Sequence, residues 1–537
     1  MDSLSVYAVS AGGIFVALLF FKLLSIIAPS SYMRTISFVT QRSGLFSVIV
    51  SRHLTLPYVL RRHQFCGPWT RAGVLLHFAF TAINIFLIFF KAKSLNDCGR
   101  RAGELALINL IFPLSGANLS YLADTLGIRW STCRKLHRTT GWIAAALLLF
   151  HMVVSVRNQG YTFSLSEIRN IFTMLAGISF CLTVLTSIPW FRQWSYEIFL
   201  RGHQLLTGFF VYSTWQHLTS QSHSSRTYLI VAMGILVLTL SLQVMTLLYR
   251  NGLFTGRGTP RAIVSFSASI SEKNDTVINA VHIRVSLPRP VKVKAGQYIN
   301  LWMPSVNLWS WTQTHPFMIT SWSTDAQDSL ELYVQPCNGL TADLCRYARD
   351  AAGNSLAFVA LFSGPHGVSE DVKKYRTILV FASGSGIAAA IPYLKQIIHD
   401  YNTCISKIEK LHFVWQLDSP AEMNSALHLL NALLDDDNTE KGHKLHISIY
   451  IQGDFHRPEY SLGEHDRVFI YGETPDYKTI ILDKCGDKMG GLLSPCDGRS
   501  QTLVIVSATN GIRDHIRETV REYLNKGLKL SEQEYQP

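Results

Sequence analysis

The sequence predicts a membrane all-α helical bundle of about seven spanning helices, followed by a small β-barrel and an α/β domain with a parallel sheet. Three observations predict this order. Seven long apolar runs lie in the first half of the 537 residues. Short alternating runs follow them, and strand-like and helix-like segments alternate near the end. Because only 16% of residues are charged and 48% are apolar, the composition argues against a wholly soluble or disordered chain.

The apolar runs are each close to the ~20 residues needed to cross a hydrocarbon layer. They cover residues 6–28, 72–90, 104–122, 137–156, 170–190, 197–217 and 227–248. The first run has no basic region before it, and Ile26 stands where a cleavage site needs a small residue. We therefore expect an uncleaved first helix and a basic loop at 1–70, and a further membrane domain at 71–250.

The basic charge of the chain follows the membrane topology. The formal net charge is +12, from 49 Lys and Arg against 37 Asp and Glu. With the amino terminus outside, the inner loops carry ten Lys and Arg and the outer loops six, and the inner stretch 29–71 has six Arg and no acidic residue. Basic loops mark the inner side, so we expect the later domains in the cytosol. This distribution excludes a nucleic-acid binder, whose charge would cluster on one soluble face.

Four histidines in the membrane half share one spacing. His137 and His151 are fourteen residues apart in the fourth run, and His203 and His217 are fourteen apart in the sixth. Fourteen helical residues come within about 40° of four full turns and rise about 21 Å, so each pair lies on one helix face. The two helices run in the same direction, because two crossings separate them. His137 is therefore level with His203, and His151 with His217.

Two level pairs of imidazoles are typical of two stacked bis-histidine b-type haems clamped between two helices. The alternative, polar side chains that bond between helices, suits a lone histidine such as His77. A mononuclear zinc site is disfavoured, because no cysteine or carboxylate stands near the histidines at ligand spacing. Gly141, Gly202 and Gly208 flank the set and would let a flat macrocycle approach, although they equally serve helix packing.

The second half of the chain begins with alternating strand-like segments. Between residues 262 and 336 the runs AIVSFSAS, VINAVHIRVSL, GQYINLWM and LELYVQP are separated by prolines and glycines, which predicts a small antiparallel barrel. The segment HPFMITSWS, from His315 to Ser323, could place backbone groups along a flavin ring. Proline before a strand is also ordinary turn chemistry, so this segment alone leaves both readings open.

A stronger signal follows in RTILVFASGSGIAAAIPYL. A buried strand leads through Gly384, Ser385, Gly386 and Ile387 into a helix, and amides at such a helix start can cradle a pyrophosphate. Ala389 occupies the third glycine position of the usual motif, so a plain tight turn remains the alternative. The strands LHFVWQL and TLVIVSA indicate a parallel sheet.

In this order the motifs resemble the fungal ferric reductases, or metalloreductases, of the ferric reductase and NADPH oxidase superfamily. The resemblance covers roughly residues 70–537 and rests on the two histidine pairs, on His315-Pro316-Phe317 and on the loop beginning at Gly384. It implies an FAD-binding barrel of the ferredoxin reductase type at 251–370 and an NAD(P)-binding domain at 371–537. It also implies electron transfer from cytosolic NADPH, with NADH not excluded, through FAD, the inner haem and the outer haem.

The resemblance also implies site residues. His137, His151, His203 and His217 would be the iron ligands, and no side-chain acid or base is required. The cofactor-binding positions would be Gly296, Gln297, Tyr298, His315, Pro316, Phe317, Met318, Ile319, Thr320, Gly339, Thr341, Gly384, Ser385, Gly386 and Ile387. The electron acceptor would be an Fe(III) chelate or Cu(II), and the protein would lie in the plasma membrane in contact with lipid; partner subunits stay unknown.

The sequence departs from the family at three places. Met318 stands where a hydroxyl residue often follows His-Pro-Phe, and Ser507-Ala-Thr-Asn-Gly511 replaces a Cys-Gly-Pro motif. Leu417-Asp418 stands where an arginine usually follows the Trp415 strand, which leaves the choice between NADPH and NADH open. Two other functions therefore stay in view: an oxidase that reduces O₂ to superoxide, and a haem-binding membrane protein with little turnover.

Overall fold

The computed structural model describes residues 2–63, 67–159, 166–218, 223–252, 255–270, 276–336, 339–350, 355–406, 408–437, 442–451, 459–462, 466–486 and 502–533. All structural statements concern these residues. The chain forms two compact units. Unit 1 comprises Met1–Arg42 and Tyr58–Met245, and unit 2 comprises Ser43–Pro57 and Thr246–Pro537.

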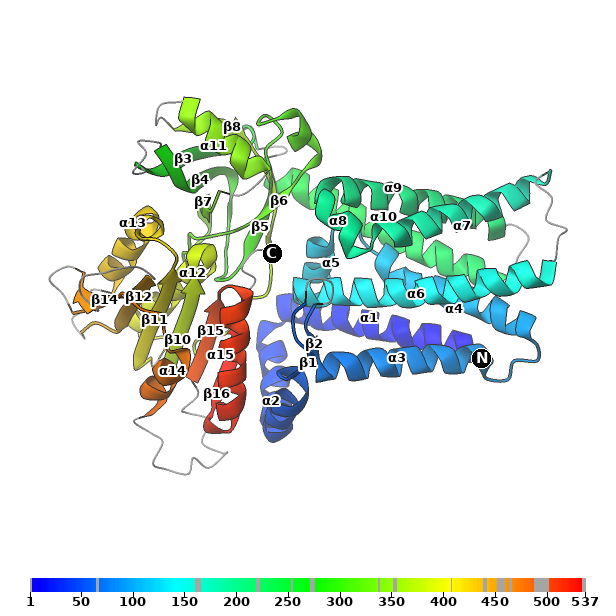
Figure 1. The fold of residues 1–537 in the computed structure, drawn as a ribbon, viewed down its shortest axis with the longest axis horizontal. Coiled ribbons are helices and arrows are strands. Elements are labelled where there is room, and N and C mark those ends of the chain that lie inside the picture. The colour runs from blue at the N-terminus through cyan, green and yellow to red at the C-terminus, as the bar shows by residue number, and fades with distance from the viewer. Residues whose placement is uncertain are drawn as a thin grey trace. The chain divides into compact units, whose positions relative to one another are not determined.

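Unit 1 is a helical bundle (Figure 1). Its long helices are α1 (Ser3–Ile27), α3 (Arg71–Phe89), α4 (Leu95–Leu114), α6 (Trp130–Gln159), α7 (Ile168–Thr186), α9 (Tyr196–His217) and α10 (His223–Arg250). The shorter α5 (Leu119–Leu126) and α8 (Pro189–Trp194) lie between them, and β1 (Tyr58–Leu60) pairs with β2 (Trp69–Thr70). The helix α2 (Pro29–Val50) and a π-helical turn at Ser51–Thr55 connect the two units in sequence.

Among the described residues, fewer helices than the predicted seven are long and apolar enough to span a membrane: five, or six if a bent pair counts as one span. All seven apolar runs are helical, but among the described residues five helices are long and apolar enough to cross a membrane: α1, α3, α6, α7 and α10. The predicted span 104–122 is instead a bent pair, because α4 ends at Leu114 and α5 leaves at 93° to it. The Asn118 side chain starts α5 by accepting from the amides of Ser120 and Tyr121. α9 is not one of the five, because Glu197, Arg201, two glutamines and its two histidines lower its mean hydropathy.

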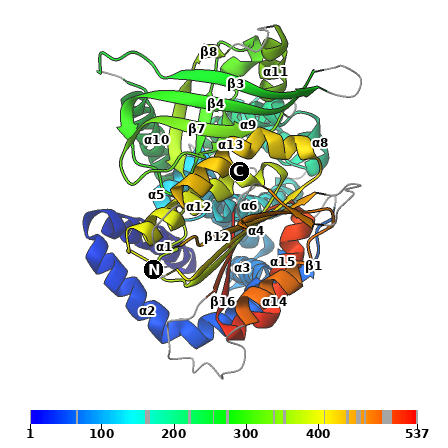
Figure 2. The ribbon, with the colours of Figure 1, turned by 90° about the vertical axis from the view of Figure 1, so that its left-hand side faces the viewer.

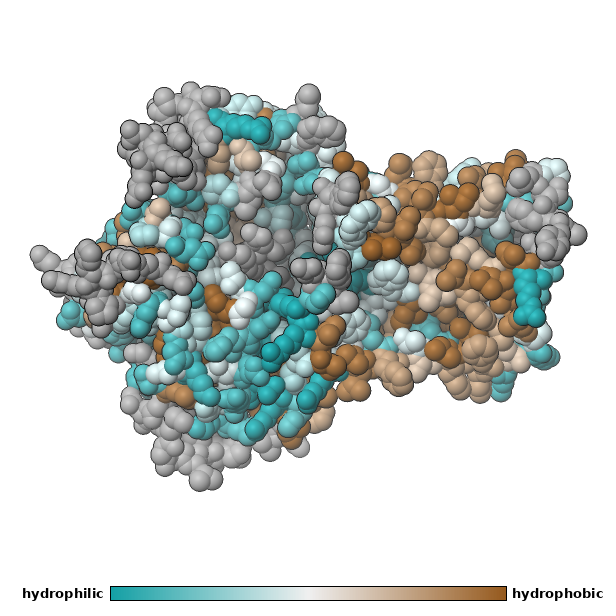
Figure 3. Space-filling view, in the orientation of Figure 1, coloured by the Kyte–Doolittle hydropathy of each residue, from teal (hydrophilic) through white to brown (hydrophobic). Residues whose placement is uncertain are grey.

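The bundle exposes apolar side chains where a soluble protein would bury them. Between 6% and 22% of each span's most apolar stretch is buried inside the protein. In the face shown in Figure 3, apolar residues cover most of these helices. Because the backbone bonds of each helix are satisfied internally, such a surface suits lipid. Unit 1 is therefore the membrane domain of a multi-pass protein.

The first part of unit 2 is a barrel of two antiparallel sheets. One sheet has the order β7 (Gln327–Val334), β4 (Thr276–Val291), β3 (Arg261–Ile270) and β8 (Leu356–Val359). The other has the order β6 (His315–Met318), β5 (Tyr298–Trp302) and β9 (Leu361–His366). A bridge between Ile319 and Leu332 links them, and α11 (Leu340–Asp350) packs against the core that they share. The predicted antiparallel barrel is confirmed.

The second part of unit 2 is a three-layer α/β domain (Figure 2). Its seven strands are ordered β13 (Glu459–Ser461), β14 (Val468–Tyr471), β12 (Leu445–Ile451), β11 (Lys410–Leu417), β10 (Thr377–Ser383), β15 (Thr502–Ser507) and β16 (Leu528–Glu532). All pairs except β13–β14 are parallel. The helices α12 (Ile387–Asn402) and α13 (Pro420–Asp436) cover one face, and α14 (Tyr477–Gly486) and α15 (Asn510–Tyr523) cover the other. Such burial on both faces explains why β10 is apolar from Ile378 to Ala382.

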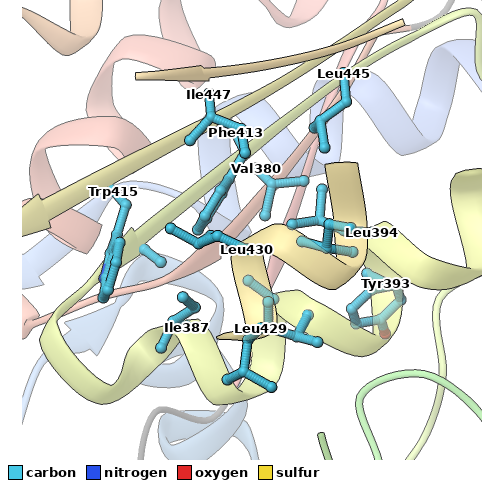
Figure 4. Close-up of a cluster of buried hydrophobic side chains, with 14 of the residues drawn as sticks. Val380, Ile387, Tyr393, Leu394, Phe413, Trp415, Leu429, Leu430, Leu445 and Ile447 are labelled. Atoms are coloured by element: carbon cyan, nitrogen blue, oxygen red, sulfur yellow. The ribbon is translucent and has the colours of Figure 1, made fainter. Parts of the chain in front are cut away.

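One hydrophobic core joins the barrel to the α/β domain. Tyr298, Met318 and Tyr333 of the barrel belong to the same buried cluster as α12, α13 and strands β10 to β12. Figure 4 shows part of this cluster, where Phe413 and Trp415 of β11 lie on the side of the sheet that α12, with Ile387 and Leu394, covers. The two domains are therefore one packed body, which fixes the predicted flavin segments relative to the nucleotide loop.

Candidate functional site

The helices of the membrane domain that bear the four histidines belong to two closely packed helix pairs. α6, with His137 and His151, packs against α4, and α9, with His203 and His217, packs against α7. At one level the ring centres of His137 and His203 are 6.3 Å apart. At the other level, fourteen residues further along the same two helices, His151 and His217 are near enough for the charge of one to influence the other. The structure therefore brings the rings of His137 and His203 together and places His151 near His217, as the fourteen-residue spacing predicts.

The separation at the first level suits a shared metal. Two imidazoles that bind one metal ion through bonds of about 2 Å have their ring centres about 6 Å apart, which matches the 6.3 Å between His137 and His203. Among the described residues no group of three His, Cys, Asp or Glu side chains could hold a metal ion. A ligand that completes the coordination itself, as a porphyrin does, therefore fits these pairs better than a bare ion.

The Nδ1 atoms of three of these histidines already have partners. The Nδ1 atoms of His151, His217 and His203 form hydrogen bonds with the Gly99 carbonyl, the Thr173 hydroxyl and the Ser187 hydroxyl, respectively. Such partners are typical of metal-bound histidines, because they fix the tautomer and leave Nε2 for the metal. His77 differs, since Gly73 O lies 2.7 Å from its Nδ1 and Thr139 Oγ1 lies 2.6 Å from its Nε2. Both nitrogens of His77 are thus used within the bundle.

A cavity of about 1140 Å³ opens beside the first pair. It is lined by His137 of α6, His203 and Gly208 of α9, and by residues of α4, α5 and α10 that include Pro113 and Met233. A Cβ added to Gly141, Gly202 or Gly208 would meet nothing within 4 Å, so these glycines do not serve close helix packing inside unit 1. The cavity is apolar and large, as a macrocycle requires.

The predicted flavin segment at Gly296 is held by packing against the nucleotide domain. Gly296 has φ of 79°, and a Cβ there would lie 2.6 Å from the Tyr393 hydroxyl of α12, so only glycine fits. The Gln297 amide is used inside the barrel, where it accepts from Lys294 N and donates to the Gly367 carbonyl at 3.3 Å. Tyr298 is 4% exposed and lies against His366.

The segment from His315 to Thr320 divides into two halves. His315, Pro316 and Phe317 are partly exposed on β6, so their side chains can contact a ligand. Met318, Ile319 and Thr320 are 6%, 0% and 2% exposed, and the Thr320 hydroxyl donates to the Glu331 carbonyl. These three can contact a flavin only through their backbone. The Met318 side chain packs in the shared core.

Two helix starts of unit 2 are each preceded by a glycine in the left-handed region. Gly339, with φ of 77°, precedes α11, and Thr341 in its first turn is buried. Gly384, with φ of 47°, opens a turn at Gly384–Gly386 that continues into α12. Ser385 is partly exposed there, and Gly386 and Ile387 are buried. Amides at such helix starts bind phosphate groups well.

Sequence reasoning missed the residues that support these sites. The Trp415 indole donates to the Gly384 carbonyl at 3.0 Å, and the Ser383 hydroxyl accepts from Thr509 N at 2.8 Å. In the membrane bundle, sequence reasoning missed Gly99 and Thr173, which bond to His151 and His217. The small-residue spacing of Gly99 and Gly103 on α4 was a usable signal, since it is typical of close helix contacts in membranes. The other partners carry no local signal.

Fold and sites together define the class of protein: a multi-pass helical domain joined to a barrel and a nucleotide-type α/β domain. Comparison with known families identifies this class more narrowly. The profile of the ferric reductase like transmembrane component matches residues 102–214. An FAD-binding domain profile matches residues 265–370, and the ferric reductase NAD binding domain profile matches 375–509. The chain belongs to the ferric reductase transmembrane component family, with FAD- and NAD-binding domains, so the predicted fold class and family are confirmed.

Individual relatives agree with this family. The chain is 26% identical to a probable cell surface ferric reductase (kap2) of Aspergillus oryzae, over 60% of this chain and 43% of that protein. It is 24% identical to the ferric/cupric reductase transmembrane component 1 of Candida albicans, over 70% of this chain and 50% of that protein. The chain spans about half the length of the curated relatives it matches. A flavohemoglobin structure from Malassezia yamatoensis aligns with a TM-score of 0.36 and 11% identity, over 82% of this chain and 99% of that one.

Proposed function

We propose that this protein carries electrons across a membrane, from cytosolic NAD(P)H through FAD and two b-type haems to a metal acceptor on the far side. Fe(III) chelates are the proposed acceptor, and Cu(II) is a second one. The observation that carries the proposal is the arrangement of His137 with His203 and of His151 with His217 at two levels between two helix pairs.

The relatives support the choice of acceptor. Members of the family from three fungi are named as ferric or as ferric/cupric reductases. The flavin and haems, when bound, convert a two-electron hydride donor into one-electron steps that iron can accept. Within this chain the four histidines would hold the irons through Nε2, and the apolar spans would exclude water from the path.

The nucleotide cofactors have separate candidate positions in unit 2. The exposed edge of β6, from His315 to Phe317, and the turn at Gly296 would orient the flavin, with its phosphates at the Gly339 turn and the start of α11. The Gly384–Ile387 turn would hold the pyrophosphate of NADPH, with NADH not excluded, through backbone amides. We place the domain boundaries at 251–370 and 371–537.

The same proposal implies a membrane topology for the chain. The amino terminus would lie outside the plasma membrane and unit 2 in the cytosol, since the loops assigned to the inner side carry more Lys and Arg. Tagging the amino terminus and residue 537 in intact cells would test this, because only the first tag should be accessible from outside. Accessibility of the second tag would contradict the assignment.

A spectroscopic experiment tests the proposed function directly. Membranes that contain the protein should show a reduced-minus-oxidised haem spectrum after addition of NADH or NADPH, with bleaching of the flavin. Fe(III) chelate, Cu(II) and O₂ are then offered in turn on the far side. Reoxidation by the metals supports the proposal, and reoxidation by O₂ alone with superoxide release indicates an oxidase. If the flavin does not bleach, the protein is a haem-binding protein with little turnover.

A histidine substitution tests the route. His217→Ala should abolish reduction of external metal while the nicotinamide still reduces the flavin. His77→Ala is the matched control, because this histidine lies in α3 with both ring nitrogens bonded inside the bundle, and it should retain metal reduction. An unchanged rate of metal reduction in His217→Ala would exclude the two-haem route.

A further inference from the structure

The two histidine pairs differ in how their Nδ1 atoms are held. At the His151–His217 pair, the Nδ1 atoms lie 2.8 Å from Gly99 O and 2.8 Å from Thr173 Oγ1. At the other pair, His203 Nδ1 lies 3.3 Å from Ser187 Oγ. The buried His137 Nδ1 has no hydrogen-bond partner within the described part of the chain. Short hydrogen bonds therefore hold both rings of the His151–His217 pair, whereas one longer hydrogen bond holds the His137–His203 pair.

The partners of the His151–His217 pair also determine the tautomers. A carbonyl only accepts, so His151 must donate its Nδ1–H to Gly99 O. The Thr173 hydroxyl donates its own hydrogen to the Arg169 carbonyl at 2.9 Å, so its oxygen accepts the Nδ1–H of His217. In both rings the proton is on Nδ1, and the lone pair of Nε2 is left for a metal.

The backbone of α4 also fixes the plane of the His151 ring. A Cβ added to Gly103 would lie 3.0 Å from Nδ1, 3.2 Å from Cε1 and 3.3 Å from Cγ of this ring. A Cβ added to Gly99 would lie 2.7 Å from Val154 Cγ1, one turn further along α6. The two glycines thus allow the close α4–α6 contact that brings the Gly99 carbonyl within hydrogen-bonding distance of His151.

We propose that Gly99, Gly103 and Thr173 are positioning residues that make the iron between His151 and His217 the harder of the two to reduce. The inference rests on the proposed function. An imidazole that donates a hydrogen bond from Nδ1 is a stronger base at Nε2, and a stronger axial base favours Fe(III) over Fe(II). An electron would then rest mainly on the iron between His137 and His203 until an acceptor removes it from the other one.

The test is a redox titration of the full-length protein followed by haem absorbance. The wild type should titrate in two waves of different midpoint potential. Thr173→Val keeps the shape of the side chain but removes the hydroxyl, so the lower wave should shift to a more positive potential while the upper wave stays. Thr173→Ser should restore the wild-type value, because it keeps the hydroxyl.

Thr186→Val is the matched control, because this threonine lies on the same helix and its hydroxyl bonds to the carbonyls of Leu182 and Thr183. It should leave both waves in place. An unchanged lower wave in Thr173→Val, or a shift of the upper wave instead, would overturn the proposal. A wild type whose haems titrate in a single wave would also overturn the proposal, whereas purified protein without haem absorbance would overturn the proposed function itself, so the two failures are distinguishable.

A second variant probes the ring orientation. Gly103→Ala should turn the His151 ring and change the low-temperature electron paramagnetic resonance signal of one ferric haem. Gly177→Ala on α7 is its control, since a Cβ there would make an ordinary contact of 3.6 Å with Met152 Sδ. If both variants give the wild-type signal, Gly103 does not position the ring and that part of the proposal is wrong.

Discussion

Unit 1 and unit 2 distribute their internal space in opposite ways. The membrane bundle keeps a cavity of about 1140 Å³ between its helices, lined in part by Gly208 and Gly234, where an added Cβ would meet nothing within 4 Å. Unit 2 fills its interior with large side chains, of which Trp415, Tyr393 and Phe413 are 0% exposed. Its candidate cofactor sites lie instead at strand and helix ends, where a few residues such as His315, Phe317 and Ser385 are partly exposed.

This difference teaches where each unit is sensitive. In a filled core, removal of atoms leaves a void that costs stability. In a bundle that keeps room for a cofactor, adding atoms to the empty space should prevent binding without unfolding the protein. The same size change should therefore have opposite consequences in the two units.

The largest effect should come from filling the cavity of unit 1. Gly208→Leu adds a side chain where a Cβ meets nothing within 4 Å, on a residue that lines the cavity. We expect the bundle to fold and insert, and haem content to fall by about half or more, because one macrocycle is displaced. The haem-to-protein ratio of the purified protein measures this.

Gly13→Leu is the control for this prediction. Gly13 on α1 also has nothing within 4 Å of an added Cβ, but it does not line the cavity. It should bind haem like the wild type. Equal haem loss in both variants would mean that the cavity is not the haem site.

The second largest effect should come from a void in unit 2. Phe413→Ala removes a fully buried ring that stacks on Trp415 and should cost about 3–5 kcal/mol. Flavin release on heating should occur at a lower temperature, whereas haem content should not change. Phe209→Ala on α9 is the contrast, because this ring is 57% exposed and should affect flavin release little. Equal loss of flavin in both would contradict the comparison.

The sequence was sufficient for features that depend on local periodicity. The fourteen-residue spacing of His137 with His151, and of His203 with His217, predicts two levels because the helix period alone places the side chains. The glycine loop at Gly384 was predictable for the same reason, since a strand, a tight turn and a helix follow one another along the chain.

Features that depend on packing between distant segments could not be predicted. The 93° bend between Leu114 and Leu119 falls on Ser115, Gly116 and Asn118, so a turn was predictable there from local sequence, whereas its angle was not. The burial of Met318 follows from a core shared with α12. Gly99 and Thr173 act on His151 and His217 from α4 and α7, and no sequence pattern states which helices become neighbours.

A smaller effect should depend on pH and be confined to unit 2. Burial, together with nearby His428, lowers the pKa of His282 from 6.5 to about 4. Tyr333 of β7 and His428 of α13 face this ring, and Ser267 of β3 bonds to it. Between these two pH values the unfolded chain binds a proton at His282 and the folded chain does not. The free energy of unfolding should therefore fall as pH drops from about 6.5 to about 4 and level off below.

Hydrogen exchange of the full-length protein would check this. Protection in β4 and α13 should decrease over that pH range, while the bundle helices keep theirs. His282→Gln should flatten the dependence, since it removes the titrating group. An unchanged pH slope in this variant would show that another group is responsible.

The smallest effect should come from one hydrogen bond at the edge of the filled core. Trp415→Phe retains an aromatic ring in the cluster but removes the indole N–H that donates to the Gly384 carbonyl at 3.0 Å. Loss of one such bond costs about 1 kcal/mol, or roughly fivefold in affinity. Because Gly384 begins the proposed pyrophosphate turn, the KM for NAD(P)H should rise severalfold while flavin content stays constant. Trp302→Phe loses an equivalent bond to Ser310 O in the barrel and should leave this KM unchanged. If both variants raise the KM equally, the effect is a general loosening of unit 2, and Trp415 has no particular role at the turn.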